Sequence, residues 1–312
     1  MKCRIRRLAA LPLLPFACLV VALGAAGPAA AGRWGADYFP DVELTTQDGQ
    51  KVRFYDDLLK DKMVAVNVIY TRCQDECPLE TARLAMMQKA LAGHMGRDFF
   101  IYSISIDPEH DTPEVLKAYA SRFHTGPGWL FLTGRPEDVR LVTKKLGLSR
   151  QSDAVNKDGH ASSLMVGNVA KEQWTRQSAA DNPAFLATSI ANFFHWPLPG
   201  PGRSYAEARP ITTDAAQLLF QSRCSACHTV GHGDRVGPDL GGVTTRREHA
   251  WLARYLAEPD RMRAEGDPVA KALLDKYGGV PMPNLSLGTD DVAMLIGYLQ
   301  AQSPPAASRH DR

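Results

Sequence analysis

Apolar and polar positions follow one pattern up to about residue 194 and a different one beyond it. From Asp37 to about Phe194, short β-forming runs alternate with stretches that carry helix-start signals. Met63–Tyr70 is almost continuously apolar, as expected of a strand that is buried on both faces, and Phe99–Ile106 is a second strongly β-forming run. Hairpins are predicted around Asp48-Gly49 and between residues 164 and 176. This alternation predicts a three-layer α/β domain.

Prolines mark the starts of the helices between these strands. Proline suits the first helical turn because the N–H that it lacks has no partner there. Thr112-Pro113 adds an N-cap residue to this signal. The predicted helices run from Cys77 to Leu91, from Thr112 through Tyr119, from Pro136 to Leu146 and from Pro183 to Phe194. The acidic residues ahead of the second helix are interpreted as turn residues and a helix start: Asp107, Glu109 and Asp111.

The second half of the chain has helical periodicity only. Residues 196–212 are rich in proline and glycine and are predicted to be a linker. Residues 213–301 then form a small all-α domain, and residues 302–312 a disordered tail. The predicted helices of this domain begin at Thr213-Asp214, span His249 to Leu256, and begin again at Thr289.

The first 31 residues have the three parts of a secretory signal. A basic start precedes the apolar run Leu8–Leu23, and Ala29-Ala30-Ala31 offers a cleavage site. The alternative is an uncleaved membrane anchor, which the prolines inside the apolar run disfavour. We therefore expect a periplasmic or otherwise exported protein, anchored to a membrane only if the signal is retained.

Composition excludes one large class of partners. The apolar fraction of 45% and charged fraction of 22% are ordinary for a soluble globular protein. The formal net charge is +2, and removal of four basic residues with the signal leaves about −2. No basic surface for nucleic acid is implied.

The cysteines point to a haem. Cys3 and Cys18 leave with the signal, and the other four form two closely spaced pairs. Cys224 and Cys227 are followed directly by His228, which is the attachment signal for a c-type haem. The thiols form thioether bonds, and the imidazole becomes the proximal iron ligand. Zinc is the alternative, but zinc needs four ligands and this domain offers no third cysteine.

The second iron ligand is predicted to be a methionine. Met282 lies between two prolines about fifty residues after the haem histidine, in a loop able to direct a thioether at the iron. Met262 and Met294 are the rivals, with packing as their simpler role. Thioether ligation raises the reduction potential and suits electron transfer.

The other cysteine pair predicts a soft-metal or redox site. Cys73 and Cys77 follow the first buried strand and precede a helix, and chemistry in α/β sheets gathers at such strand ends. A thiol at a helix N-terminus is expected to have a lowered pKa. Two thiolates favour Cu(I), and an added imidazole makes Cu(II) acceptable. His160, just before a predicted strand, is the candidate imidazole, and a surface role is its alternative; a structural disulfide is the alternative for the pair.

Residues 213–301 resemble a class I cytochrome c. The resemblance rests on Cys224-Ser225-Ala226-Cys227-His228, on Gly237-Pro238-Asp239-Leu240, on the Met282 loop and on the final helix. It implies one covalent haem c and a supporting role for Pro238 beside His228.

Residues 37–195 resemble the Sco/SenC copper-chaperone family, which implies a thioredoxin-like fold. The matching segments are 70–78 and 106–114, followed by the distal His160. The family's copper ligands fall on Cys73, Cys77 and His160.

Together the two resemblances imply copper or electron delivery during cytochrome c oxidase assembly. Expected partners are an oxidase subunit or its assembly factors, and electron-transfer proteins. A metallochaperone and electron carrier is favoured over an enzyme. The enzymatic alternative is a thiol–disulfide reductase with Cys73 and Cys77 as its catalytic dithiol. Further alternatives are a plain electron carrier whose α/β domain docks a partner, and a peroxidase, which the fold also hosts.

Overall fold

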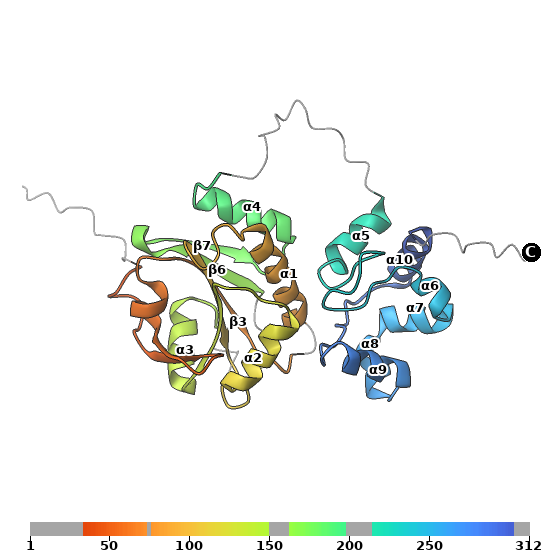
Figure 1. Cartoon of the computed structure of the whole chain (residues 1–312), viewed down its shortest axis with the longest axis horizontal. Coiled ribbons are helices and arrows are strands. Elements are labelled where there is room, and N and C mark those ends of the chain that lie inside the picture. The colour runs from red at the N-terminus through yellow and green to blue at the C-terminus, as the bar shows by residue number, and fades with distance from the viewer. Residues whose placement is uncertain (1–33, 74–75, 150–161, 198–213, 303–312) are drawn as a thin grey trace, which may run out of the picture. The chain divides into compact units, whose positions relative to one another are not determined.

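The computed structural model describes residues 34–73, 76–149, 162–197 and 214–302. Within these ranges a mixed sheet with its helices comes first, and a group of helices follows (Figure 1). The predicted fold class, an α/β domain followed by an all-α domain, is confirmed. The predicted signal and most of the predicted linker and tail lie outside the described residues. No helix in the described ranges combines the length and apolar character needed to cross a membrane.

Seven strands form one sheet in the order β2-β1-β5-β4-β3-β6-β7. The central strands β3, β4 and β5 are parallel, and the strands on both sides of them pair antiparallel. Both predicted hairpins are present, as β1–β2 and β6–β7. The strands are β1 (Glu43–Thr46), β2 (Lys51–Arg53), β3 (Met63–Ile69), β4 (Phe99–Ser105), β5 (Trp129–Gly134), β6 (Ser163–Asn168) and β7 (Gln173–Ser178).

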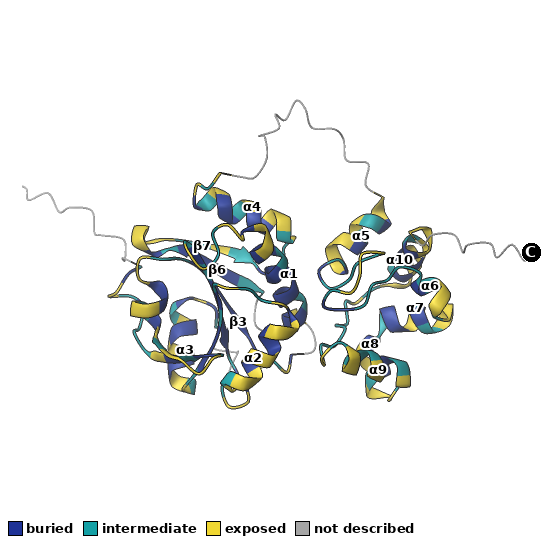
Figure 2. Cartoon of the chain, in the orientation of Figure 1, coloured by how far each residue is buried: buried dark blue, intermediate teal, exposed yellow. Residues whose placement is uncertain are grey.

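Helices cover both faces of this sheet. Helices α1 (Glu76–Ala90), α2 (Pro113–Arg122) and α4 (Pro183–Phe193) share one apolar core with the sheet. The π-helix η1 (Phe54–Leu59) and α3 (Pro136–Lys145) share the core on the opposite face. Successive side chains of β3 enter these two cores alternately, so the strand is buried on both faces as predicted (Figure 2).

Three chain segments converge at one edge of the sheet. The parallel register pairs Ile69, the last residue of β3, with Ser105, the last residue of β4. The loops after both strands therefore leave the sheet side by side. Strand β6 runs antiparallel to β3, with Met165 opposite Val66, so its first residue, Ser163, lies at this same edge. This edge holds the first candidate site.

The C-terminal helices enclose a separate apolar core. Phe220, Leu252, Leu295 and Leu299 are among its buried members. The helices are α5 (Ala215–Arg223), α6 (Val243–Arg246), α7 (His249–Ala257), α8 (Pro259–Ala264), α9 (Pro268–Lys276) and α10 (Thr289–Ala301). The sequence predicted three helices here, whereas the described residues form six, and prolines open two of the added helices, α8 and α9.

The last helix, α10, begins at Thr289 as predicted, and its cap lies one residue earlier. Gly288, not Thr289, is the N-cap residue of α10. The Asp291 carboxylate reaches back and accepts a hydrogen bond of 3.1 Å from the Gly288 N–H. An acidic third helical residue can satisfy the N-terminal backbone without a capping hydroxyl.

Candidate metal and haem sites

The first cysteine pair lies where β3 passes into α1. Cys73 and Cys77 are both buried, with exposed fractions of 5% and 0%. The backbone N–H of Cys77 points at the Cys73 sulfur at 3.5 Å. The first sulfur thus sits at the N-terminus of α1, where the helix dipole favours negative charge.

The pKa of the second thiol, Cys77, shifts in the direction opposite to the one that the sequence predicted. Its hydrogen bond with Cys73 and its burial raise the pKa of Cys77 far above its usual range. The expected lowering of the pKa is therefore wrong for Cys77. Cys77 lies inside the first turn of α1, which begins at Glu76, and its hydrogen bond with Cys73 together with its burial outweighs the helix dipole.

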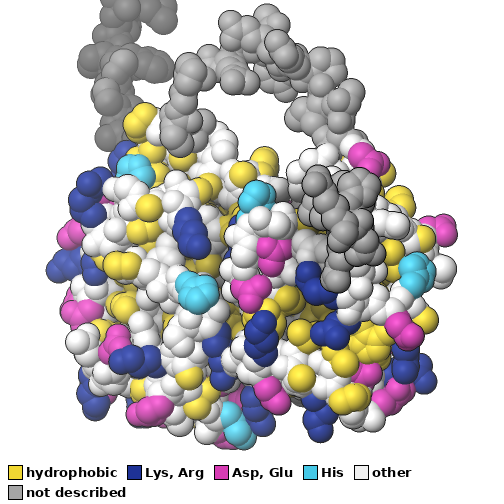
Figure 3. Space-filling model, turned by 45° about the vertical axis from the view of Figure 1, so that its right-hand side comes forward, with side chains coloured by type: hydrophobic (Ala, Val, Ile, Leu, Met, Phe, Trp, Pro, Cys, Tyr) yellow, Lys and Arg dark blue, Asp and Glu magenta, His cyan; other side chains and the backbone are white. Residues whose placement is uncertain are grey.

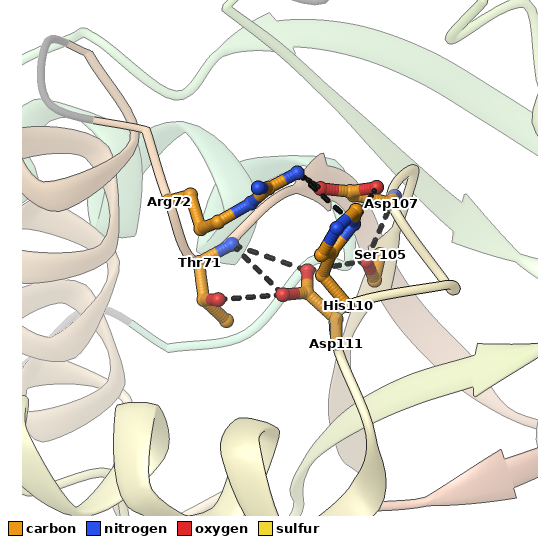
Figure 4. Close-up of polar contacts among 6 residues, drawn as sticks. All are labelled: Thr71, Arg72, Ser105, Asp107, His110 and Asp111. Atoms are coloured by element: carbon orange, nitrogen blue, oxygen red, sulfur yellow. Dashed lines mark hydrogen bonds and ion pairs between the residues drawn. The ribbon is translucent and has the colours of Figure 1, made fainter.

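A buried carboxylate holds the loop that leads to Cys73 (Figure 4). Asp111 is fully buried. It accepts hydrogen bonds from the Thr71 N–H at 3.1 Å, the Thr71 hydroxyl at 2.5 Å and the Ser105 hydroxyl at 2.5 Å. Asp111 thereby connects the end of β4 to the residues that follow β3.

A second carboxylate supports the next residue of that loop. Asp107, 2% exposed, accepts a hydrogen bond of 2.7 Å from the Arg72 guanidinium. The His110 ring lies beside both, with its Nδ1 atom 3.0 Å from the Arg72 Nη2 atom and 3.0 Å from the Asp107 Oδ1 atom. Both residues that precede Cys73 are therefore held in place by the loop after β4 (Figure 4).

The local sequence pattern did not predict this support. The sequence pattern suggested only a turn residue for Asp107 and a helix start for Asp111, whereas the structure shows both buried and hydrogen-bonded. The position of the two acids in the sequence was the available signal. They come directly after the strand β4, and the parallel pairing of β4 with β3 places them beside the loop that follows β3. Buried carboxylates need such partners, because desolvation is otherwise too costly.

The predicted imidazole ligand, His160, lies outside the described residues. Two observations concern the described residues that follow it in the sequence. Ser162 is described, and its hydroxyl donates a hydrogen bond of 3.1 Å to Glu76, at the start of α1. β6 then begins at the sheet edge from which the Cys73 loop leaves. Among the described residues alone, no three His, Cys, Asp or Glu side chains gather as a metal site.

The second candidate site is a cavity of about 920 Å³ in the helical domain. Cys224 and Cys227, which follow α5, line it together with His228 and Met282. Of the two rival methionines, Met262 is buried against Tyr255 and Ala270, and Met294 is 39% exposed on α10. In the described part of the chain, neither rival lines this cavity. The cavity thus brings the predicted haem residues together.

The backbone around Pro238 orients the His228 ring. The Nδ1 atom of His228 lies 2.9 Å from the Pro238 carbonyl oxygen, so Nδ1–H donates and Nε2 keeps its lone pair for a metal. Burial lowers the pKa of His228, which favours the neutral, ligating imidazole. The support that the cytochrome c resemblance implied for Pro238 is present as this hydrogen bond. These residues fit a covalent haem.

A single carboxylate organises the loop between His228 and Pro238. The Asp239 side chain accepts hydrogen bonds from the N–H groups of Gly231, Gly233 and Gly241 at 2.5–2.7 Å. The Gly241 N–H, aided by the other two, lowers the pKa of Asp239 to about 2. The loop beside the haem histidine thus depends on the charge of one residue.

Acid is expected to loosen this loop. Because the folded pKa is below the unfolded value of about 3.9, Asp239 stabilises the fold fully above that pH and loses its contribution as the pH falls toward 2. Asp239→Asn is expected to cost about 2 kcal/mol at neutral pH and to remove part of the acid sensitivity. Urea unfolding at several pH values measures both effects. A variant that keeps the full acid sensitivity would contradict the assignment.

Comparison with known proteins finds a different family in each half of the chain. The SCO1/SenC family model matches residues 31–194, and the cytochrome c family model matches residues 213–303. A SCO2-like protein of Rickettsia felis is 35% identical over 105 residues, which are 34% of this chain and 49% of that protein. A putative copper-binding protein of Stutzerimonas stutzeri is 30% identical over 131 residues, 42% of this chain and 62% of its own.

One solved structure is BsSco, described as a member of the Sco family of cytochrome c oxidase assembly proteins. It is 25% identical, with a TM-score of 0.41, over 48% of this chain and 90% of that one. The chain spans about half the length of the curated relatives that it matches first.

Proposed function

Because the chain belongs to the SCO1/SenC family and carries a cytochrome c domain, we propose that it is an exported copper-binding redox protein. Its role is to deliver copper or reducing equivalents during cytochrome c oxidase assembly, with an oxidase subunit or assembly factor as the partner. Copper is held by Cys73, Cys77 and His160. A haem c at Cys224 and Cys227, with His228 and Met282 on the iron, exchanges single electrons.

One observation carries the copper assignment: the hydrogen bond between Ser162 and Glu76. Glu76 directly precedes Cys77, and Ser162 follows His160 by two residues. Two residues span at most about 7 Å, and this short sequence separation between His160 and Ser162 supports the proposal that His160 supplies the third copper ligand. An imidazole added to two thiolates has the right chemistry for copper.

The state of the thiols favours metal binding over thiol exchange. An attacking cysteine needs to be an accessible thiolate. Cys77 is fully buried and its pKa is raised, and Cys73 is only 5% exposed. A soft metal ion removes this obstacle, because it displaces the protons as it binds.

The two cofactors match in electron count. Oxidation of Cu(I) to Cu(II) releases one electron, and ferric haem takes up one electron to become ferrous. A dithiol that closes to a disulfide releases two electrons. The haem therefore pairs more directly with copper than with a bare disulfide.

The decisive experiment compares His160→Ala with Cys73→Ser in copper titrations of the full chain. Both variants are expected to lose more than about 100-fold in copper affinity, because even outer-shell changes cost 10–100-fold. His160→Ala is expected to keep the reactivity of its thiols toward a disulfide reagent. Competition with a chromophoric Cu(I) chelator gives the affinities.

The matched control is His124→Asn, at an exposed histidine just beyond α2 whose positive φ asparagine tolerates. It is expected to bind copper normally. Normal copper affinity in His160→Ala, combined with lost thiol exchange in Cys73→Ser, would overturn the copper assignment and favour the reductase.

A further inference from the structure

A half-buried arginine in the haem cavity has part of its hydrogen-bonding capacity unused. Arg263, on α8, lines the cavity together with Met282. Its Nη1 atom donates a hydrogen bond of 2.8 Å to the Met282 carbonyl oxygen. Its Nη2 atom is buried and has no acceptor among the described residues. A guanidinium is always charged, and an unsatisfied buried N–H of such a group is costly.

The neighbouring arginines do not share this situation. Arg254 and Arg261 form ion pairs with Glu258 and Glu265 at 2.6–3.3 Å on the domain surface. Among the described residues, Arg263 has no carboxylate within ion-pair distance. Glu258 and Glu265 are thus paired with the two exposed arginines. The arginine that lines the cavity has no ion-pair partner among the described residues.

Other polar groups of the cavity wall are already engaged. The Trp251 indole N–H donates to the Asp267 carboxylate at 3.1 Å, and the other oxygen of Asp267 caps α9 through the Ala270 N–H at 2.8 Å. Burial raises the pKa of Tyr255, which lies beside Arg263, and both the guanidinium charge and a side-chain hydrogen bond with Arg263 oppose that rise. This contact leaves the buried Nη2 atom of Arg263 without an acceptor among the described residues. The missing partner of Arg263 is therefore an anion that enters the cavity with its occupant.

We propose that Arg263 binds a propionate carboxylate of the haem and connects it to the Met282 loop. Haem c carries two propionates, and a guanidinium pairs with a carboxylate in a fixed, charge-assisted geometry. The Nη1 atom then holds the Met282 carbonyl oxygen, and the Nη2 atom pairs with the negative charge of the propionate. The inference rests on the proposed haem attachment and adds a residue that tunes the iron.

The charge of Arg263 sets the direction of the effect. A positive charge near the haem disfavours the ferric state and raises the reduction potential. Without it, the propionate has a higher pKa, and its ionisation as the pH rises stabilises ferric haem. Loss of the guanidinium is therefore expected to lower the potential and to make it fall more steeply with pH.

The test measures the reduction potential of the full, haem-loaded chain from pH 5 to pH 9. Arg263→Gln is expected to shift the reduction equilibrium about tenfold toward ferric haem, which is about 59 mV for one electron, and to steepen the pH dependence. Arg263→Lys keeps the charge but cannot make both contacts. It is expected to keep most of the potential and to weaken the absorption band of thioether-ligated ferric haem. Arg261→Gln, on the exposed side of α8, is the control and is expected to match the wild type.

Each outcome separates the possibilities. Haem-loaded Arg263→Gln with a wild-type potential and pH profile would overturn the inference. A weakened thioether band with an unchanged pH profile would show that Arg263 only holds the loop, which overturns the propionate contact. If Arg263→Gln does not load haem, Arg263→Lys provides the test. A wild-type thioether absorption band together with a wild-type pH dependence of the potential in Arg263→Lys would also overturn the inference. Absence of covalent haem from the wild-type chain would instead contradict the proposed function itself.

Discussion

Asp111→Ala is expected to lower the free energy of unfolding by about 3 kcal/mol and to weaken copper binding. The change removes the acceptor of two buried donors on Thr71 and of the Ser105 hydroxyl. Each donor left without a partner costs about 1–3 kcal/mol. The loop that positions Cys73 loses its fixed geometry at the same time. Denaturant unfolding and a chelator-competition titration measure the two losses.

Two variants make this prediction specific. Asp111→Asn keeps the shape but replaces one accepting oxygen by a donor, so it is expected to fall between the wild type and Asp111→Ala. Glu109→Ala changes an exposed acid of the same loop and is expected to alter neither stability nor copper affinity by a measurable amount. Equal effects at Glu109 and Asp111 would show that loop charge, and not the buried hydrogen bonds, supports the cysteine loop.

Gly237→Val is expected to disrupt the haem site as strongly as loss of a ligand. A Cβ atom at residue 237 would lie 2.6 Å from the Cε1 atom and 3.0 Å from the Nδ1 atom of His228. The ring has to turn, which breaks its hydrogen bond to the Pro238 carbonyl. Overpacking of this kind costs about 1–3 kcal/mol in a well-packed site. Covalent haem content and the low-spin optical spectrum are expected to fall at least about tenfold.

The control for this variant is a glycine with room beside it. Gly297, in α10, has nothing within 4 Å of an added Cβ atom. Gly297→Ala is expected to leave the haem spectrum unchanged and to stabilise the helix by about 0.5–1 kcal/mol. A normal spectrum in Gly237→Val would mean that the His228 ring is not held against this backbone.

Charged side chains of both signs lie on the face of the molecule that Figure 3 shows. Basic and acidic side chains are interspersed there, and no large patch of one sign dominates (Figure 3). Interspersed charge gives little of the phosphate attraction on which nucleic-acid binding depends. This matches the small charge excess of the sequence.

The sequence by itself determined the features that depend on local spacing. Buried strands, proline-opened helices and the two cysteine pairs are all recorded within a few consecutive residues. The attachment signal at Cys224, Cys227 and His228 is the clearest case, because the thiols and the imidazole have to fit one ring system. The two families could be recognised from the same short segments.

Only the tertiary structure decided which distant groups meet. Asp111 has the local signature of a residue before a helix, yet it is buried because parallel pairing of β3 and β4 brings Thr71 beside it. The raised pKa of Cys77 likewise comes from its hydrogen bond with Cys73 and from burial, which together outweigh the helix dipole that the sequence suggested. Arg263 resembles its exposed neighbours in sequence, and packing alone turns it toward the cavity. Burial and long-range pairing carry large energies that no local sequence pattern records, so these roles appear only in the folded chain.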